Sequence, residues 1–171
     1  VLEEPPSRAR FVLTAARPRL LPPTILSRLV LRRLPSPTHE ALVASLVARG
    51  LPPEEAASRA AFCPTGEEEA LELDLATARA ARDGLLEAAS GLLLSGSTGW
   101  ALVLAGRLAA EDAAATADRF GLLARVLRDA VAAATDPAGR TVLHAERYRD
   151  LARLAEAGTG VLLAAADRAL R

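Results

Sequence analysis

The chain has 171 residues, which is enough for one ordinary domain or two small ones. Its 21 basic residues balance 21 acidic ones, so the net charge gives no reason to expect general attraction to nucleic acid or to a membrane surface. No apolar run reaches the ~18 residues that a membrane span needs. The single cysteine, Cys63, excludes an internal disulfide and a cysteine-based metal site, and we expect a reducing, cytoplasmic compartment.

Composition predicts a mainly α-helical protein. Hydrophobic residues make up 51% of the chain but aromatic residues only 3%, so the core must consist mainly of Leu, Val and Ala. Ala and Leu favour helices, whereas the Ile and aromatic residues that favour strands are scarce.

Prolines punctuate the N-terminal part of the chain, and one short apolar run, residues 11–13, stands between them. Its Phe-Val-Leu sequence is typical of a buried strand. A single strand needs a sheet, and no later segment clearly supplies one. We therefore expect the chain to be a piece of a longer protein whose preceding domain holds that sheet. Residues 20–28 then predict a tight loop that leads into a short helix.

Three short helices are predicted next. The first has Ser36 as its N-cap and Pro37 at its first position, and Gly50 stops it. The second covers about residues 53–62 and the third about residues 67–73. Each is too short to be stable alone, so the three should pack together as one small unit.

Five longer helices are predicted from residue 75 onward. One has apolar residues at helical spacing and charged residues largely off that face. The apolar positions are Phe120, Leu123, Val126, Leu127, Ala130 and Val131, and the charged ones are Asp118, Arg125, Arg128 and Asp129. The other four helices cover about residues 75–94, 99–109, 141–157 and 159–170. Together they predict a helical bundle.

The chain cannot build an ATP-binding P-loop, because it has no Lys and no Gly-rich loop of that pattern. We therefore do not expect this chain to be an enzyme, and we expect it to hold no cofactor or metal. The other chemically capable side chains are interpreted as structural. They are His39 and His144, Cys63 as a buried and inert thiol, Glu67–Glu69 as a solvated helix start, and Trp100 as an anchor between helices.

Ser27 and Arg28 form the pair that suggests a function. They follow an apolar turn in a segment that Pro22 and Pro23 restrain. An Arg at the end of such a short helix is pre-positioned and always charged, which suits a phosphate contact made across a subunit boundary. A Ser-Arg pair without that context would simply be a surface feature.

Three segments occur in the order and spacing of the bacterial clamp-loader AAA+ subunits. They are Leu-Glu-Glu-Pro-Pro-Ser at residues 2–7, Phe-Val-Leu-Thr-Ala at 11–15 and Leu-Leu-Pro-Pro-Thr-Ile-Leu-Ser-Arg at 20–28. The chain resembles that family, in which an L-E-E-P-P helix end, a sensor-1 strand and an L-L-P-T-I-x-S-R-C motif follow one another. Residues 122–134 are more loosely similar to the family's collar helix.

The resemblance implies three structural parts. Residues 1–34 would be the end of an AAA+ α/β domain, with the strand and the helix of the Ser-Arg motif. Residues 35–74 would be a three-helix lid. Residues 75–171 would be a five-helix collar, which holds a pentameric ring together.

The resemblance also implies roles for single residues. Arg28 would be an arginine finger that reaches the ATP of a neighbouring subunit, and Ser27 and Thr24 would support its helix. Thr14 would lie near the sensor-1 position. ATP and Mg²⁺ would be bound by the neighbouring subunits, so catalysis in cis is not implied.

Departures from the motifs favour one subunit type. The usual Cys after Ser-Arg is Leu29, and an extra Pro precedes Thr24. Where the ATPase subunits have a sensor-2 Arg, this chain has Glu67–Glu69, and acidic residues repel phosphate. This pattern is closest to the delta-prime subunit of the DNA polymerase III clamp loader, which assists assembly without hydrolysing ATP.

The implied partners are the clamp-loader gamma/tau and delta subunits and, through the complex, the sliding clamp and primed DNA, with no membrane. Two alternatives remain open. The chain could be a fragment of the gamma/tau ATPase, which an upstream P-loop would indicate. It could also be a free-standing helical protein-interaction module, since residues 75–171 predict a self-sufficient bundle.

Overall fold

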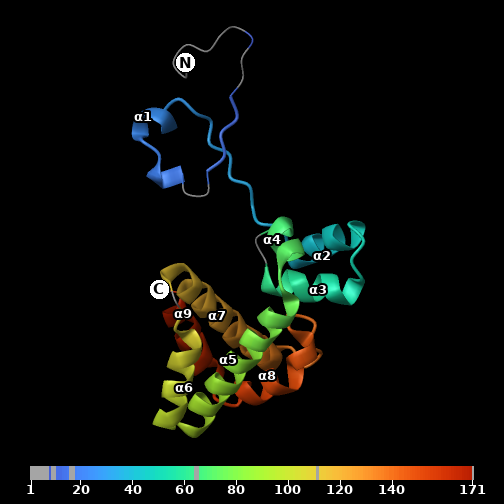
Figure 1. Ribbon diagram of the computed structural model, residues 1–171, viewed down its shortest axis with the longest axis vertical. Coiled ribbons are helices and arrows are strands. Elements are labelled where there is room, and N and C mark those ends of the chain that lie inside the picture. Colours follow the sequence, from blue (N-terminus) through green and yellow to red (C-terminus); the bar gives the residue numbers. More distant parts are fainter. Residues whose placement is uncertain (1–7, 9–10, 16–17, 64–65, 111, 171) are drawn as a thin grey trace. The chain divides into compact units, whose positions relative to one another are not determined.

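The computed structural model describes residues 8, 11–15, 18–63, 66–110 and 112–170 (Figure 1). The chain divides into two units, Val1–Pro35 and Ser36–Arg171. All regular secondary structure in the described residues is helical, which confirms the prediction of a mainly α-helical protein.

The first unit contains two short helical turns, the 3₁₀ turn Pro18–Leu20 and helix α1 (Pro23–Leu26). The strand expected at residues 11–13 is not formed. Residues 11–15 have irregular backbone, and Phe11, Val12 and Leu13 are 46%, 91% and 51% exposed. A strand is stabilised by hydrogen bonds to a neighbouring strand, and the described residues provide none. Residues 2–7 of the motif lie outside the described residues.

Helices α2 (His39–Ala48), α3 (Pro53–Phe62) and α4 (Glu67–Glu72) pack together, and we call them the three-helix subdomain. The first helix begins later than predicted, because Thr38 rather than Ser36 is its N-cap. The Thr38 hydroxyl accepts a hydrogen bond from the amide of Ala41. The subdomain buries small and branched apolar side chains: Leu42, Leu46, Ala56, Ala60 and Ala70.

Arg59 ties α3 to the end of α4. Its Nε is 2.8 Å from a carboxylate oxygen of Glu55, one turn earlier in α3. Its Nη1 donates to the backbone carbonyls of Ala70, Leu71 and Leu73, at 2.8, 3.1 and 2.9 Å. These carbonyls have no partner within so short a helix, so the guanidinium satisfies them.

Helices α5 (Leu75–Ser95), α6 (Thr98–Leu108), α7 (Ala113–Thr135), α8 (Tyr148–Ala155) and α9 (Thr159–Ala169) form the bundle. Helix α7 contacts both α8 and α9, and α5 contacts α6, α7 and α8 (Figure 1). The carboxylates of Asp74 and Asp112 accept hydrogen bonds from free backbone amides in the first turns of α5 and α7, respectively. Helix α5 ends at Gly96, whose φ of 66° lies in the left-handed region that glycine adopts without strain.

Helices α5 and α6 form an antiparallel hairpin in which two large side chains of α6 lie over two glycines of α5. The indole of Trp100 lies directly over Gly91, where a Cβ atom would overlap with the indole carbons. One heptad away along α5, the guanidinium of Arg107 lies over Gly84, with its Cζ 3.2 Å from the place of a Cβ. The two glycines therefore let the large side chains of α6 approach the α5 backbone.

The helix predicted at 141–157 begins only at Tyr148, after a 3₁₀ turn at Ala145–Arg147. Aspartate side chains accept hydrogen bonds from backbone amides that would otherwise donate within a helix. Asp136 accepts from the amides of Ala138 and Thr141, each at 3.1 Å, and Asp129 accepts from the amide of His144 at 2.9 Å. Side-chain acceptors of this kind favour turns over helix.

Two positions of the amphipathic α7 pattern were predicted wrongly. Phe120, expected in the core, is 36% exposed, whereas Asp129, expected off the apolar face, is fully buried. Of the other predicted core residues, Leu123, Val126, Leu127 and Ala130 are buried and Val131 is half-buried, so the face itself is correct. Asp129 lies three residues after Val126 and so shares its side of the helix.

Candidate functional site

Arg28 follows the shortest α-helix of the described residues. Pro23 stands at the start of α1 after Pro22, which has an extended backbone, and proline suits the first helical position. The amide of Ser27 donates to the carbonyl of Pro23 at 2.9 Å, and the amide of Arg28 donates to that of Ile25 at 3.1 Å. The turn therefore carries Arg28 at its C-terminal end, as the sequence predicted.

The carbonyl oxygen of Thr24 brings together the predicted site residues of α1. It accepts a hydrogen bond from the Ser27 hydroxyl at 3.2 Å and another from Nη1 of Arg28 at 3.1 Å. All three residues are exposed. The support that Thr24 gives comes from its backbone and not from its hydroxyl, so the side-chain type at residue 24 contributes little to these two contacts.

Thr14 lies apart from this cluster in the chain. It belongs to the exposed, irregular residues 11–15, and no hydrogen bond of its side chain is formed with the described residues. The sensor-1 role therefore stays a prediction from the resemblance alone.

Asp129 and His144 form a buried pair that the sequence did not indicate. Their exposed fractions are 0% and 1%, and Nδ1 of His144 lies 2.8 Å from Oδ2 of Asp129. The ring of Phe62 contacts the His144 ring edge to face, with centroids 4.9 Å apart. His144 was predicted to be structural, and its burial at a helix junction agrees with that prediction. Asp129 could have been found from its spacing to Val126 and Ala133 on one side of α7.

Cys63 is buried at 2% exposure, as predicted for an inert thiol. Burial, followed by the nearby Glu69 carboxylate, raises the pKa of the thiol from 9.0 to about 11. Burial lowers the pKa of Arg125, which lines the same cavity of about 410 Å³ between α3, α4, α5 and α7. The thiol is therefore protonated and unreactive at neutral pH.

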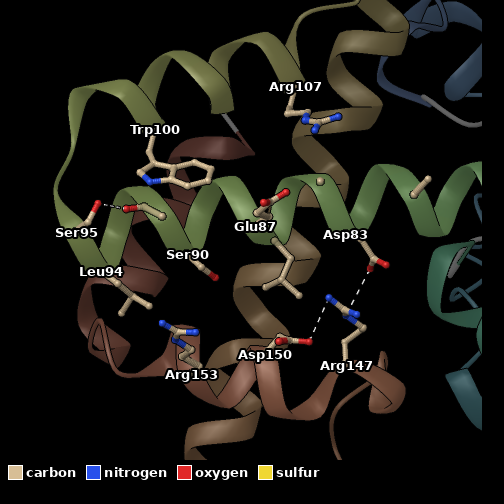
Figure 2. Close-up of a pocket in the computed structure, with 14 residues that line it drawn as sticks. Asp83, Glu87, Ser90, Leu94, Ser95, Trp100, Arg107, Arg147, Asp150 and Arg153 are labelled. Atoms are coloured by element: carbon tan, nitrogen blue, oxygen red, sulfur yellow. Dashed lines mark hydrogen bonds and ion pairs between the residues drawn. The ribbon is translucent and has the colours of Figure 1, made fainter.

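A larger groove of about 800 Å³ lies between α5, α6 and α8 with the turn that precedes it (Figure 2). Arg147 bridges Asp83 and Asp150 across it, at 3.6 and 3.2 Å. Three arginines and three carboxylates line the groove together: Arg107, Arg147, Arg153, Asp83, Glu87 and Asp150. Because these charges balance, the lining favours neither anions nor cations. Trp100 forms part of one wall and anchors α6 on α5, as predicted.

The acidic run Glu67–Glu69 occupies the first turn of α4, where negative charge suits the helix dipole. Glu67 forms an ion pair with Nε of Arg49, which follows α2. Glu68 and Glu69 are exposed. The run thus begins α4, with Glu67 tied to Arg49 and Glu69 close to the Cys63 thiol.

No protein-family model matches the chain, and neither a curated protein nor a solved structure matches it significantly. Within the described residues, no group of three or more His, Cys, Asp or Glu side chains could hold a metal ion. In that same part of the chain, no helix is both long and apolar enough to cross a membrane. Any functional assignment therefore depends on the residues of the chain itself.

Proposed function

We propose that this chain serves as part of a delta-prime-like, non-catalytic subunit of a bacterial DNA polymerase III clamp loader. The observation that carries the proposal is the segment at residues 20–28, which places Arg28 at the end of a proline-started helical turn. The motifs at residues 2–7 and 11–15 precede it in the family's order.

Arg28 would donate an arginine finger to the ATP of a neighbouring subunit. A finger must be exposed, permanently charged and held near its working position before the partner arrives. Arg28 is exposed, and its hydrogen bond to the Thr24 carbonyl restrains it against its own helical turn. Residues 1–35 contain seven arginines and two glutamates, so the segment as a whole favours a polyphosphate partner.

The acidic start of α4 supports a subunit that does not itself bind nucleotide. In the gamma/tau ATPase alternative, an Arg would be expected near this position to contact ATP. Here Glu67 pairs with Arg49, and the exposed carboxylates of Glu68 and Glu69 stand in the same first turn of α4. Three carboxylates at this place oppose a triphosphate.

The bundle would serve as the collar through which the subunit joins its neighbours. Helices α6 and α9 have one buried residue each, Leu108 and Leu162 respectively. Both also expose large apolar side chains, which favour contact with other proteins: Leu102, Val103, Val161 and Leu163. The same exposure supports the second candidate function, a free-standing interaction module.

The finger role can be tested with Arg28→Ala in the full-length subunit, reconstituted with the gamma/tau and delta subunits. Hydrolysis at the one neighbouring active site should fall by roughly 10³, so the ATPase rate should drop to what the remaining sites supply. Assembly of the complex should be unchanged, because Arg28 lies outside the bundle.

Arg32→Ala is the matched control. Arg32 is also an exposed arginine, four residues further on, and should leave the ATPase rate unchanged. Equal ATPase rates in the Arg28→Ala and unmodified complexes would refute the finger role.

A further inference from the structure

Phe62, the last residue of α3, joins the three-helix subdomain to the bundle. Its side chain is 6% exposed. Its ring contacts two side chains of the bundle, His144 edge to face at 4.9 Å and the guanidinium of Arg82 at 5.5 Å from the ring centroid. One aromatic side chain of the subdomain is thus inserted into a socket that the bundle provides.

The socket is made of buried polar and charged groups. Arg82, Asp129 and His144 are the three buried residues of this kind in the described chain, and all three belong to the socket or hold it in place. Arg82 lies on α5 and forms ion pairs with Asp83 and Glu146. Asp129 on α7 holds His144 through both its backbone amide and its Nδ1.

Two atoms of this socket lack a partner. Nε2 of His144 and Oδ1 of Asp129 are buried without a hydrogen bond to any described residue. Burying a polar atom without a hydrogen-bond partner, or burying a charge, costs free energy. Contact with water would recover part of that cost. Withdrawal of Phe62 would let water reach the His144 ring and the Arg82 guanidinium that it contacts, and this gain opposes the loss of apolar burial. A purely apolar socket would have no such compensation.

The rest of this junction belongs to one continuous hydrophobic core but also contains a cavity. The cavity of about 410 Å³ that Cys63, Glu69 and Arg125 line lies between the subdomain and the bundle. Beside it, Arg79 of α5 donates one exposed hydrogen bond to Ser58 of α3 at 2.8 Å. The subdomain has apolar contacts of its own between α2, α3 and α4, which would hold its helices together if it separated from the bundle.

We propose that Phe62 is a reversible latch, whose withdrawal from the Arg82–His144 socket releases the three-helix subdomain from the bundle without unfolding either. The latch is independent of the clamp-loader proposal, since it needs no partner protein or nucleotide. It gives the chain two arrangements of α2–α4 whose relative populations depend on the charges of the socket.

The test measures a distance between the two parts. With Cys63 replaced by Ala, spin labels are attached to Ala44→Cys on α2 and Ala134→Cys on α7, both exposed positions. The parent protein should give one dominant distance with a minor second population. Phe62→Leu keeps an apolar side chain but loses the ring contacts, and it should raise the second population at least about tenfold while helix content stays constant.

Two further variants make the outcome decisive. Leu154→Val, a fully buried change in α8 away from the socket, should lower the melting temperature and leave the distance distribution unchanged. Glu146→Gln removes an ion pair of Arg82 and should raise the second population even if Phe62→Leu proves unfolded. Unchanged distributions in both the Phe62 and Glu146 variants would overturn the latch. Equal broadening in Leu154→Val would overturn it too, since it would indicate general loosening.

Discussion

The thiol of Cys63 shows how burial controls the chemistry of a single side chain. Its thiolate would be an anion without a paired cation, in contact with apolar groups and close to the Glu69 carboxylate. Arg59 and Arg125 favour the thiolate, but these two influences are smaller than burial. Between pH 9.0 and about 11, the folded protein therefore keeps the thiol protonated, whereas an unfolded chain would lose the proton.

Cys63 should react with iodoacetamide far more slowly in the folded protein than after unfolding. A shift of the pKa from 9.0 to about 11 lowers the thiolate fraction at pH 8 roughly a hundredfold, and burial slows access further. The measurement is the rate of alkylation by mass spectrometry with and without denaturant. Similar rates in both conditions would show that Cys63 is accessible.

The same shift fixes the sign of a pH effect on stability. Between pH 9 and about 11 the unfolded chain releases the thiol proton and the folded chain retains it. The free energy of unfolding should therefore decrease as pH rises through this window. Cys63→Ala should lack this part of the alkaline decrease.

Asp129 shows at the same scale why some residues escape prediction. A charged residue within an apolar pattern is assigned to solvent by default, because a buried charge is costly without partners. Its partners, the amide and ring of His144, lie 15 residues away in the sequence. Only the folded chain brings them together.

At the scale of helices, the α5–α6 hairpin depends on the absence of a side chain at Gly91. A Cβ there would overlap with the indole of Trp100, which is anchored on α6. Gly84 offers a contrast, because its neighbour is the flexible guanidinium end of Arg107. A Cβ atom is therefore tolerated at Gly84 but not at Gly91, although both glycines lie on one face of α5.

Gly91→Ala should destabilise the protein by about 1–3 kcal/mol, the usual cost of overpacking, despite the better helix propensity of Ala. Gly84→Ala is the matched control and should be neutral or stabilise by up to about 1 kcal/mol. Urea unfolding followed by Trp100 fluorescence measures both. Equal stabilities for the two variants would contradict the close packing of Trp100 on Gly91.

Helix boundaries were predictable where local chemistry determines them. The glycine and proline breaks gave the limits of α3, α5 and α9 to within one or two residues. The start of α8 was not predictable, because Asp129 and Asp136 take amides that the local sequence would assign to a helix. Long-range acceptors override local helix propensity at that segment.

For the molecule as a whole, the helical class followed from composition and periodicity, although α8, with 8 residues, is shorter than the long helix predicted there. The sequence also placed Ser27 and Arg28 at the end of a short helix, as the structure has them. The sequence could not predict the contacts around Phe62, because the residues that make them come from α3, α5, α7 and the turn before α8. Apolar periodicity identifies which face of a helix is buried, but not the residues against which that face packs.

The strand expected at residues 11–13 belongs to this scale too. An apolar run predicts burial, but burial needs a second surface. In the first unit the described residues do not provide one, and Val12 remains 91% exposed. The clamp-loader proposal requires that a sheet outside the described residues pairs with this segment.

The proposed function requires that the chain assembles with clamp-loader subunits. The most direct measurement mixes this 17.9 kDa chain with the gamma/tau and delta subunits of the same organism and determines the eluting mass by size-exclusion chromatography with light scattering. The proposal predicts a hetero-oligomer that contains the chain. Separate elution of the chain at 17.9 kDa, and of the full-length subunit at its own mass, would contradict it and favour an independent helical interaction module.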